Sequence, residues 1–177
     1  MEFDEVITKR RSIRKYLDKQ VSEDDLHKII EAAILAPSWK NSQVTRYYIA
    51  KSDEVLQQVK MTLPEFNQNN VENASALIVS TIVLNYSGFQ KDGIPNNELG
   101  NGWGYYDCGM HNMNLLLKAT ELGLSTLVMG IRDAQKIKEI FDIPDNQSVV
   151  SVIAVGYSDF QPEMPQRKKV EDIAVIK

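Results

Sequence analysis

Two stretches decide how this chain is interpreted: Arg10-Arg11-Ser12-Ile13-Arg14 and, further along, Ala36-Pro37-Ser38-Trp39-Lys40-Asn41-Ser42-Gln43. The first carries three guanidiniums and a hydroxyl group, which match the oxygen atoms of a phosphate. The second carries hydroxyl and carboxamide groups, and a carboxamide offers both a donor and an acceptor to the imide edge of a heterocycle. A ligand with a phosphate at one end and such a ring at the other is a nucleotide or a flavin mononucleotide.

The composition around these stretches is that of an ordinary globular protein. The chain has 177 residues, of which 43% are hydrophobic and 25% charged, and we expect a single domain over 1–177. Its formal charge is −4, which argues against a nucleic-acid binder. Basic residues nevertheless cluster between Lys9 and Lys19, and local positive charge in an acidic protein indicates a small anionic ligand.

Several classes of protein are excluded by what the chain lacks. Cys108 is the only cysteine, and the two histidines, His27 and His111, are not spaced as metal ligands, so we expect neither an intrachain disulfide nor a metal. The acidic start has no apolar segment of the kind found in signal peptides. The longest apolar run, 74–84, is too short to cross a bilayer, so we expect a cytoplasmic protein that does not enter the membrane.

The apolar spacing predicts alternating helices and strands without a regular βαβ repeat. Pro37 ends the second helix, so 36–43 is expected to be a loop, and the Gly- and Asn-rich segment 85–104 a flexible lid or binding loop. The predicted elements are helices at 3–10, from an N-cap at Ser22, from a cap at Asp53 to 63, at 105–122 and after Asp133, with strands at 46–51, 76–84, 125–129 and 149–157. This order indicates an α+β fold with a mixed or mostly antiparallel sheet flanked by helices.

The helix at 105–122 is apolar on nearly every side, which is typical of a buried helix. A domain of this size has difficulty covering all faces of such a helix. We therefore expect a homodimer.

Acid–base machinery is scarce in the sequence. Gly100, Gly102 and Gly104 do not follow a strand and do not complete a dinucleotide fingerprint, and no serine has the context of a hydrolase nucleophile. Cys108 lies in the apolar helix, where a small core residue is expected rather than a nucleophile. Good binding groups without catalytic groups indicate that a cofactor performs the chemistry, so we predict no catalytic side chain.

These residues resemble the FMN-dependent nitroreductase family. The resemblance begins with Arg10–Tyr16 and Ala36–Gln43. It continues through Asp107-Cys108-Gly109, Leu122-Gly123-Leu124, Met129-Gly130, Val155-Gly156-Tyr157, Gln166-Arg167-Lys168 and Glu171-Asp172, so that it covers essentially the whole chain.

The resemblance implies an intertwined homodimer with FMN at the subunit interface. Arg10, Arg11, Ser12 and Arg14 are then expected to hold the phosphate, ribityl chain and pyrimidine side, with Arg167 and Lys168 closing on the phosphate. The residues expected to reach the flavin from the partner are Pro37, Ser38, Trp39, Asn41 and Gln43. Met129 and Gly130 are expected beside the ring, with a backbone N–H near N5. The implied reaction is ping-pong hydride transfer from NAD(P)H to a nitroaromatic, quinone or related acceptor.

Two departures from the family pattern leave alternatives open. Val44 and Thr45 replace the usual proline and aromatic residue, so we expect a different wall around the bound ring. Together with the short length, this makes an FMN carrier or sensor without turnover an alternative. A specialised reaction of the flavin, such as reductive dehalogenation, is a third possibility. The chain is also short for the family. Two interpretations of Trp103, Tyr105 or Tyr106 are open: these aromatic side chains stack near the flavin, or they belong to the core. For Arg167 and Lys168 the alternative is a solvated charged segment.

Overall fold

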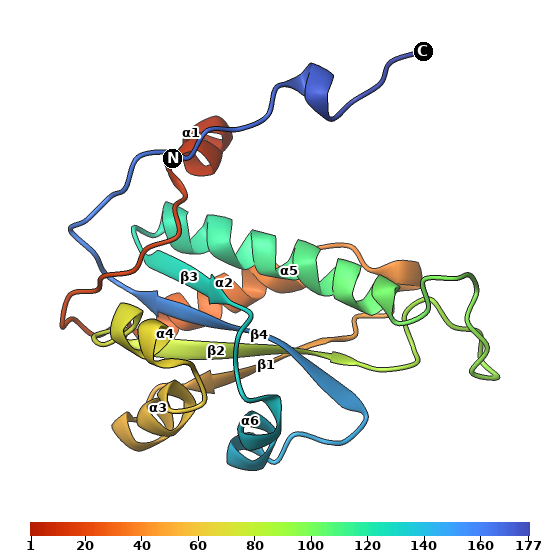
Figure 1. Ribbon diagram of the computed structural model, residues 1–177, viewed down its shortest axis with the longest axis horizontal. Coiled ribbons are helices and arrows are strands. Elements are labelled where there is room, and N and C mark those ends of the chain that lie inside the picture. Colours follow the sequence, from red (N-terminus) through yellow and green to blue (C-terminus); the bar gives the residue numbers. More distant parts are fainter.

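The computed structural model describes residues 1–177 as an antiparallel sheet between two layers of helices (Figure 1). The helices are α1 (Phe3–Lys9), α2 (Glu23–Ile34), α3 (Asp53–Lys60), α4 (Glu65–Asn70), α5 (Gly102–Glu121) and α6 (Ala134–Phe141), with short 3₁₀ turns at Trp39–Asn41 and Val170–Asp172. The strands are β1 (Thr45–Ala50), β2 (Ala76–Val83), β3 (Ser125–Met129) and β4 (Gln147–Gly156). The predicted α+β class is confirmed.

The sheet has the order β1-β2-β4-β3, and every neighbouring pair is antiparallel. Side chains alternate across it, as the strand period of two requires. Leu77 and Val79 pack in the core on the side of α3 and α6, whereas Ala76 and Ile78 pack in the core on the side of α2 and α5. The central strand β2 is therefore covered on both faces, in agreement with its continuous apolar sequence.

Helix starts follow local hydrogen bonding. Ser22 and Asp133 accept the predicted capping bonds from the N–H groups of Asp25 and Lys136, at 3.0 and 3.1 Å. The prediction of Asp53 as the cap of α3 is wrong by one residue, because Ser52 accepts the bond from Val55 and Asp53 lies in the first turn.

The longest helix, α5, begins at Gly102 rather than at residue 105. The absence of a side chain at Gly104 lets the helix approach β2, because a Cβ there would lie 3.0 Å from Ile82 Cδ1. Only one face of α5 is buried in the chain, with Tyr106 61% and Met113 47% exposed. The expectation of a helix covered on every side is therefore not met within one subunit, and the homodimer stays a prediction.

The segment between β2 and α5 is a series of hydrogen-bonded turns rather than an open chain. Asn96 N–H donates to the Gly88 carbonyl at 2.8 Å, and Trp103 Nε1 donates to Asn97 Oδ1 at 2.9 Å. Gly88 has φ +82° and lies under Trp103, where a Cβ would meet the indole at 2.6 Å. Turn geometry and close packing thus both require glycine at this position.

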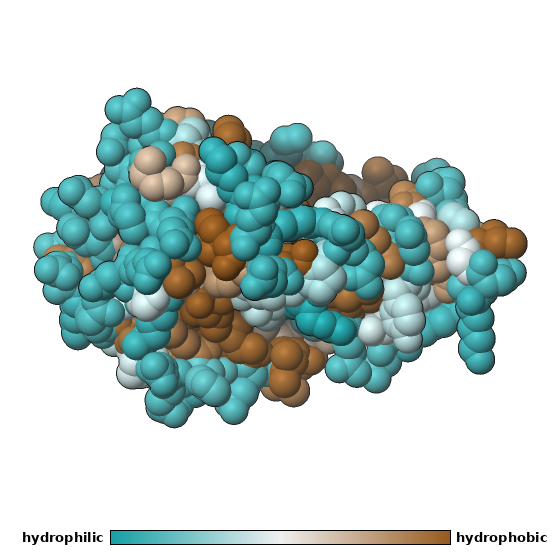
Figure 2. Space-filling view, turned by 90° about the horizontal axis from the view of Figure 1, so that it is seen from below, coloured by the Kyte–Doolittle hydropathy of each residue, from teal (hydrophilic) through white to brown (hydrophobic).

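The two ends of the chain lie on the same side of the molecule. After Phe160 the chain runs past α1 and then away from the body, with Val175 and Ile176 exposed (Figure 1). Seen from the side of α3 and α6, the surface is largely hydrophilic around a central apolar patch (Figure 2). No helix of the chain is both long and apolar enough to span a membrane.

Candidate functional site

The first motif lies where α1 ends and the chain joins the start of β3. Ile13 N–H donates to the Thr126 carbonyl at 2.9 Å, and Ser12 forms a bridge with the same residue. The guanidinium of Arg11 donates to the carbonyls of Thr8 and Arg10 at 2.6 and 2.8 Å. Arg11 therefore also closes the end of α1, where a cation suits the helix dipole.

Like charges meet at this position. Burial lowers the pKa of Arg10, and the neighbouring guanidiniums of Arg167 and Arg11 lower it further. None of the three pairs with a carboxylate. We call this cluster of Arg10, Arg11 and Arg167 the arginine end, and its unbalanced positive charge favours the approach of an anion.

The other residues predicted here differ in their contacts. Ser12 and Arg14 are exposed, and Arg14 Nη1 reaches only the Ser12 carbonyl, at 3.4 Å. Lys168 is exposed on the C-terminal segment. Their predicted roles toward a ligand stay predictions.

β3 leads from the arginine end to Met129 and Gly130. Ser125 lines the same hollow as Arg11, and the strand ends four residues later, about 14 Å away at the usual rise of a strand. Met129 is buried, whereas Gly130 has no atom within 4 Å of the position of a Cβ. Arg132, which sequence reasoning missed, donates to the Gly130 carbonyl at 3.0 Å and to the Val149 carbonyl, so it fastens this turn to β4.

The second motif forms a tight turn after α2. Ser38 Oγ accepts a hydrogen bond from the Gln43 N–H at 3.0 Å. Lys40, Asn41 and Gln43 have φ values of 47°, 56° and 49°, which are uncommon for residues other than glycine. We call residues 38–43 the amide end. Its backbone strain must be balanced by contacts with the rest of the fold.

Asp107 supplies those contacts. This carboxylate is 1% exposed and accepts bonds from the Trp39 N–H at 3.1 Å, from Ser87 Oγ at 2.6 Å and from Ser42 Oγ at 3.4 Å. Sequence reasoning gave Asp107 no role, although an acidic residue inside an apolar helix is the signal that could have found it.

His111 lies one turn beyond Asp107 and is unusual in having no partner. It is 4% exposed, and neither ring nitrogen makes a hydrogen bond. Burial lowers its pKa, and the charge of Asp107 opposes that effect in part. Cys108 lies beside it in the core, as predicted, where burial raises the pKa of the thiol to about 11.

The residues that depart from the family pattern are core residues. Val44 is 1% and Thr45 9% exposed, and Val44 packs against Ile82 and Cys108. The expectation that they change the wall around a bound ring is wrong for this chain, because their side chains do not reach a surface hollow.

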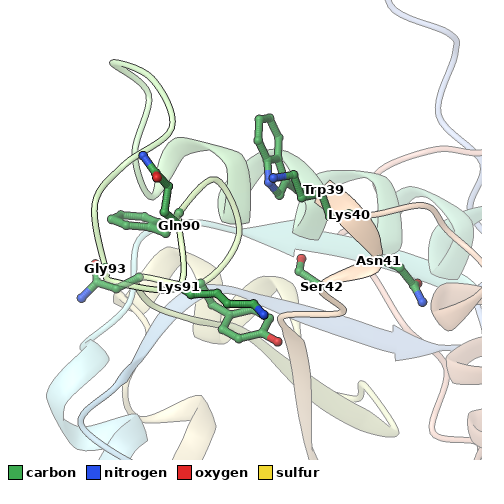
Figure 3. Close-up of a pocket in the computed structure, with 10 residues that line it drawn as sticks. Trp39, Lys40, Asn41, Ser42, Gln90, Lys91 and Gly93 are labelled. Atoms are coloured by element: carbon green, nitrogen blue, oxygen red, sulfur yellow. The ribbon is translucent and has the colours of Figure 1, made fainter.

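A hollow of about 370 Å³ separates the amide end from the 85–93 loop (Figure 3). Ser42 lies at its inner side, and Asn41 also lines it, although its side chain extends away from the 85–93 loop. Trp39 packs on Trp103 with ring centroids 4.6 Å apart, so Trp103 supports this turn from behind. Tyr105 and Tyr106 remain exposed.

The two motifs lie near opposite ends of α5. Asp107 holds the amide end, whereas Thr120 lines the hollow beside Arg11. Thirteen residues of α-helix separate them, which corresponds to about 20 Å. The chain therefore brings Arg167 to Arg10 but does not bring residues 38–43 to either of them. Pro37 is exposed near the same turn.

Comparison with known proteins assigns this architecture to a family. The model of the Nitroreductase family matches residues 7–83 and 55–157. An Archaeoglobus fulgidus protein with the provisional name NADH dehydrogenase/NAD(P)H nitroreductase is 33% identical over 156 residues, covering 86% of this chain and 83% of the relative. An NADPH-flavin oxidoreductase of Vibrio harveyi is 27% identical over 173 residues, covering 92% of this chain and 68% of its own.

Comparison with solved structures supports the same family. A nitroreductase family protein from Clostridium novyi has a TM-score of 0.78 at 30% identity, over 90% of this chain and 87% of its own. An Exiguobacterium sibiricum protein, provisionally called a nitroreductase and solved in complex with FMN, has a TM-score of 0.88 at 25% identity, over 100% of this chain and 98% of its own. The chain therefore belongs to the nitroreductase family.

Proposed function

We propose that this protein is an FMN-dependent oxidoreductase that takes hydride from NAD(P)H and passes electrons to a nitroaromatic, a quinone or a related small acceptor. The observation that carries the proposal is the arginine end. Arg10, Arg11 and Arg167 come from opposite ends of the chain, repel one another and have no carboxylate partner. A bound phosphate removes that repulsion, since guanidiniums match phosphoryl oxygens in charge and geometry.

The length of β3 supports FMN rather than a bare phosphate. A ligand anchored at the arginine end and lying along β3 reaches Met129, next to Gly130, after about 14 Å, the rise of four strand residues. The open space at Gly130 lets the backbone approach a ring closely. In this arrangement Arg10, Arg11, Ser12 and Arg14 hold the phosphate side, and Arg167 and Lys168 close over it.

The amide end is proposed to complete the site of a second copy. It lies about 20 Å from the arginine end of its own chain, so Ser38, Trp39, Asn41 and Gln43 serve a flavin only across a homodimer. The exposed Asn41 side chain extends away from the 85–93 loop of its own chain, which leaves it free to contact a partner (Figure 3). The relative from Exiguobacterium sibiricum binds FMN on the same fold.

FMN, when bound, supplies the hydride chemistry at N5. The chain orients the ring: Met129 and Gly130 border it, and Arg132 fixes the Gly130 carbonyl so that the turn keeps its shape. No side chain is assigned an acid–base role. Val44 and Thr45 are core residues and give no support to a carrier or sensor without turnover, so the short length is what remains in favour of that alternative. A cytoplasmic location stays a prediction of the sequence.

Absorbance spectroscopy tests the proposal. The purified protein, with FMN added if needed, is expected to show a flavin spectrum that NADH or NADPH bleaches without oxygen. A nitroaromatic or a quinone then restores the spectrum. Protein that does not bind FMN contradicts the proposal, and protein that binds FMN but is not reduced by either nucleotide is a carrier.

A further inference from the structure

The surface of the hollow between the amide end and the 85–93 loop carries positive charge, which the buried Asp107 beneath its walls opposes only in part. Lys40 and Lys91 line it, and no acidic residue does. Neither lysine forms an ion pair with a carboxylate, although the chain as a whole carries a charge of −4. Local charge opposite to the net charge attracts anions to this opening.

The two ammonium groups approach the hollow from opposite walls. Lys40 belongs to the strained turn, and its Nζ lies 5.8 Å from the centroid of the Trp39 ring. Lys91 extends from the 85–93 loop toward Ser42 (Figure 3). A ligand in the opening would therefore meet positive charge on both sides.

Aromatic side chains supply the remaining surface. Trp39, Tyr86 and Phe89 line the hollow together with polar amide groups. Aromatic rings present flat apolar faces on which a planar ring stacks. The lining thus combines the contacts that a ring needs with those that a negative substituent needs.

Asp107 holds both walls in place before any ligand binds. Its carboxylate accepts from the Trp39 N–H and Ser42 Oγ on one wall and from Ser87 Oγ, at 2.6 Å, beneath the other. A hollow whose walls share a buried anchor loses little entropy on binding. This favours a binding site over a chance gap between loops.

We propose that this hollow is the acceptor subsite and that it prefers a planar aromatic ring carrying a carboxylate or sulfonate. The inference rests on the proposed function, because the hollow adjoins the amide end that reaches the flavin of the second copy. It adds a substrate class, the aromatic anions, and two residues that select it, Lys40 and Lys91.

Calorimetric titration of the protein, purified with added FMN, tests this class without turnover. The probes are 4-nitrobenzoate and the neutral 4-nitrobenzamide, which share a nitrophenyl ring. Wild-type protein is expected to bind 4-nitrobenzoate more tightly, and the double variant Lys40→Met/Lys91→Met to lose roughly fivefold to tenfold of that preference. Both side chains are exposed, so the variant is expected to fold, and the equally exposed Lys136→Met in α6, on the opposite sheet face, is the matched control.

Equal binding of the two probes by wild-type protein overturns the inference, as does a preference that survives in the double variant. Weaker NADPH binding in the double variant with an unchanged preference also overturns it, because the lysines then serve the dinucleotide. Protein that keeps the preference but is not reduced by NAD(P)H refutes the proposed function alone. Protein that is reduced but shows no preference refutes this inference alone.

Discussion

At the arginine end, Arg11 and Arg167 place positive charge near Arg10 without a carboxylate partner, whereas at the amide end Asp107 accepts from the backbone and hydroxyl donors around it. The first arrangement stores repulsion that a bound anion relieves. The second is complete within one chain and holds a strained turn in shape. The difference supports our proposal that the arginine end is stabilised by its ligand, whereas the amide end is a preformed surface for the ligand of a second copy.

Removing the anchor of the amide end is expected to have the largest effect. Asp107→Ala leaves the Trp39 N–H and the hydroxyls of Ser42 and Ser87 without an acceptor, which costs about 3–5 kcal/mol of unfolding free energy. Chemical denaturation measures the loss. The exposed Asp145→Ala serves as control and should change stability by less than about 0.5 kcal/mol. A loss for Asp107→Ala as small as that of the control would show that the turn at 38–43 keeps its shape without this carboxylate.

Removing a guanidinium from the arginine end is expected to weaken ligand binding without weakening the fold. Arg10→Met loses a charge-assisted contact to phosphate, so the Kd for FMN should rise about 10- to 100-fold. The same change relieves repulsion with Arg11 and Arg167, so the FMN-free protein should be at least as stable as wild type. Flavin fluorescence titration and thermal unfolding measure the two effects. Unchanged FMN affinity would remove Arg10 from the site.

The preformed hollow depends on Gly88, and Gly93 offers a matched comparison. Both have a φ near +80°, but a Cβ at Gly88 meets Trp103 at 2.6 Å, whereas one at Gly93 meets nothing. Gly93→Ala should cost about 1 kcal/mol of unfolding free energy from backbone strain alone, and Gly88→Ala about 1–3 kcal/mol more from the clash. Equal losses of unfolding free energy in denaturant titrations would mean that the 85–93 loop moves away from Trp103 and so relieves the clash.

Acid should destabilise the amide end through His111, with the smallest effect of the series. Burial lowers the pKa of His111 in the folded protein below its ordinary value of 6.5, so the unfolded chain takes up the proton first. Stability should therefore be full above that value and fall as pH drops below it. Unfolding free energies measured from pH 7.5 to 5.5 should fall less for His111→Met than for wild type. The exposed His27→Met should follow wild type, and a parallel fall in all three would exclude His111.

The Arg10 and Arg11 part of the arginine end could be recognised from sequence because these residues are consecutive, whereas Arg167 was expected beside them only from the family resemblance. The strands and the α+β class followed from apolar periodicity, since tertiary packing here agrees with local pattern. Asp107 and Arg132 received no role because their partners, Trp39, Ser87 and Val149, are far away in sequence. Val44 and Thr45 were misplaced for the same reason: only the packing of α5 on the sheet makes them core residues.

The central claim is that one FMN site uses the arginine end of one protomer and the amide end of its partner. Two variants test it: Arg10→Met at the arginine end, and Asn41→Gly, which removes the carboxamide while glycine keeps the φ of 56°. The two chains are co-expressed with different tags, and doubly tagged heterodimers are isolated.

Flavin stoichiometry at a limiting FMN concentration is the deciding measurement. The account predicts one tightly bound FMN in each heterodimer, because one of its two sites combines two intact ends. Each parent homodimer should bind none tightly at that concentration. Heterodimers that bind no more FMN than the parents, or a protein that binds FMN as a monomer, would contradict the account.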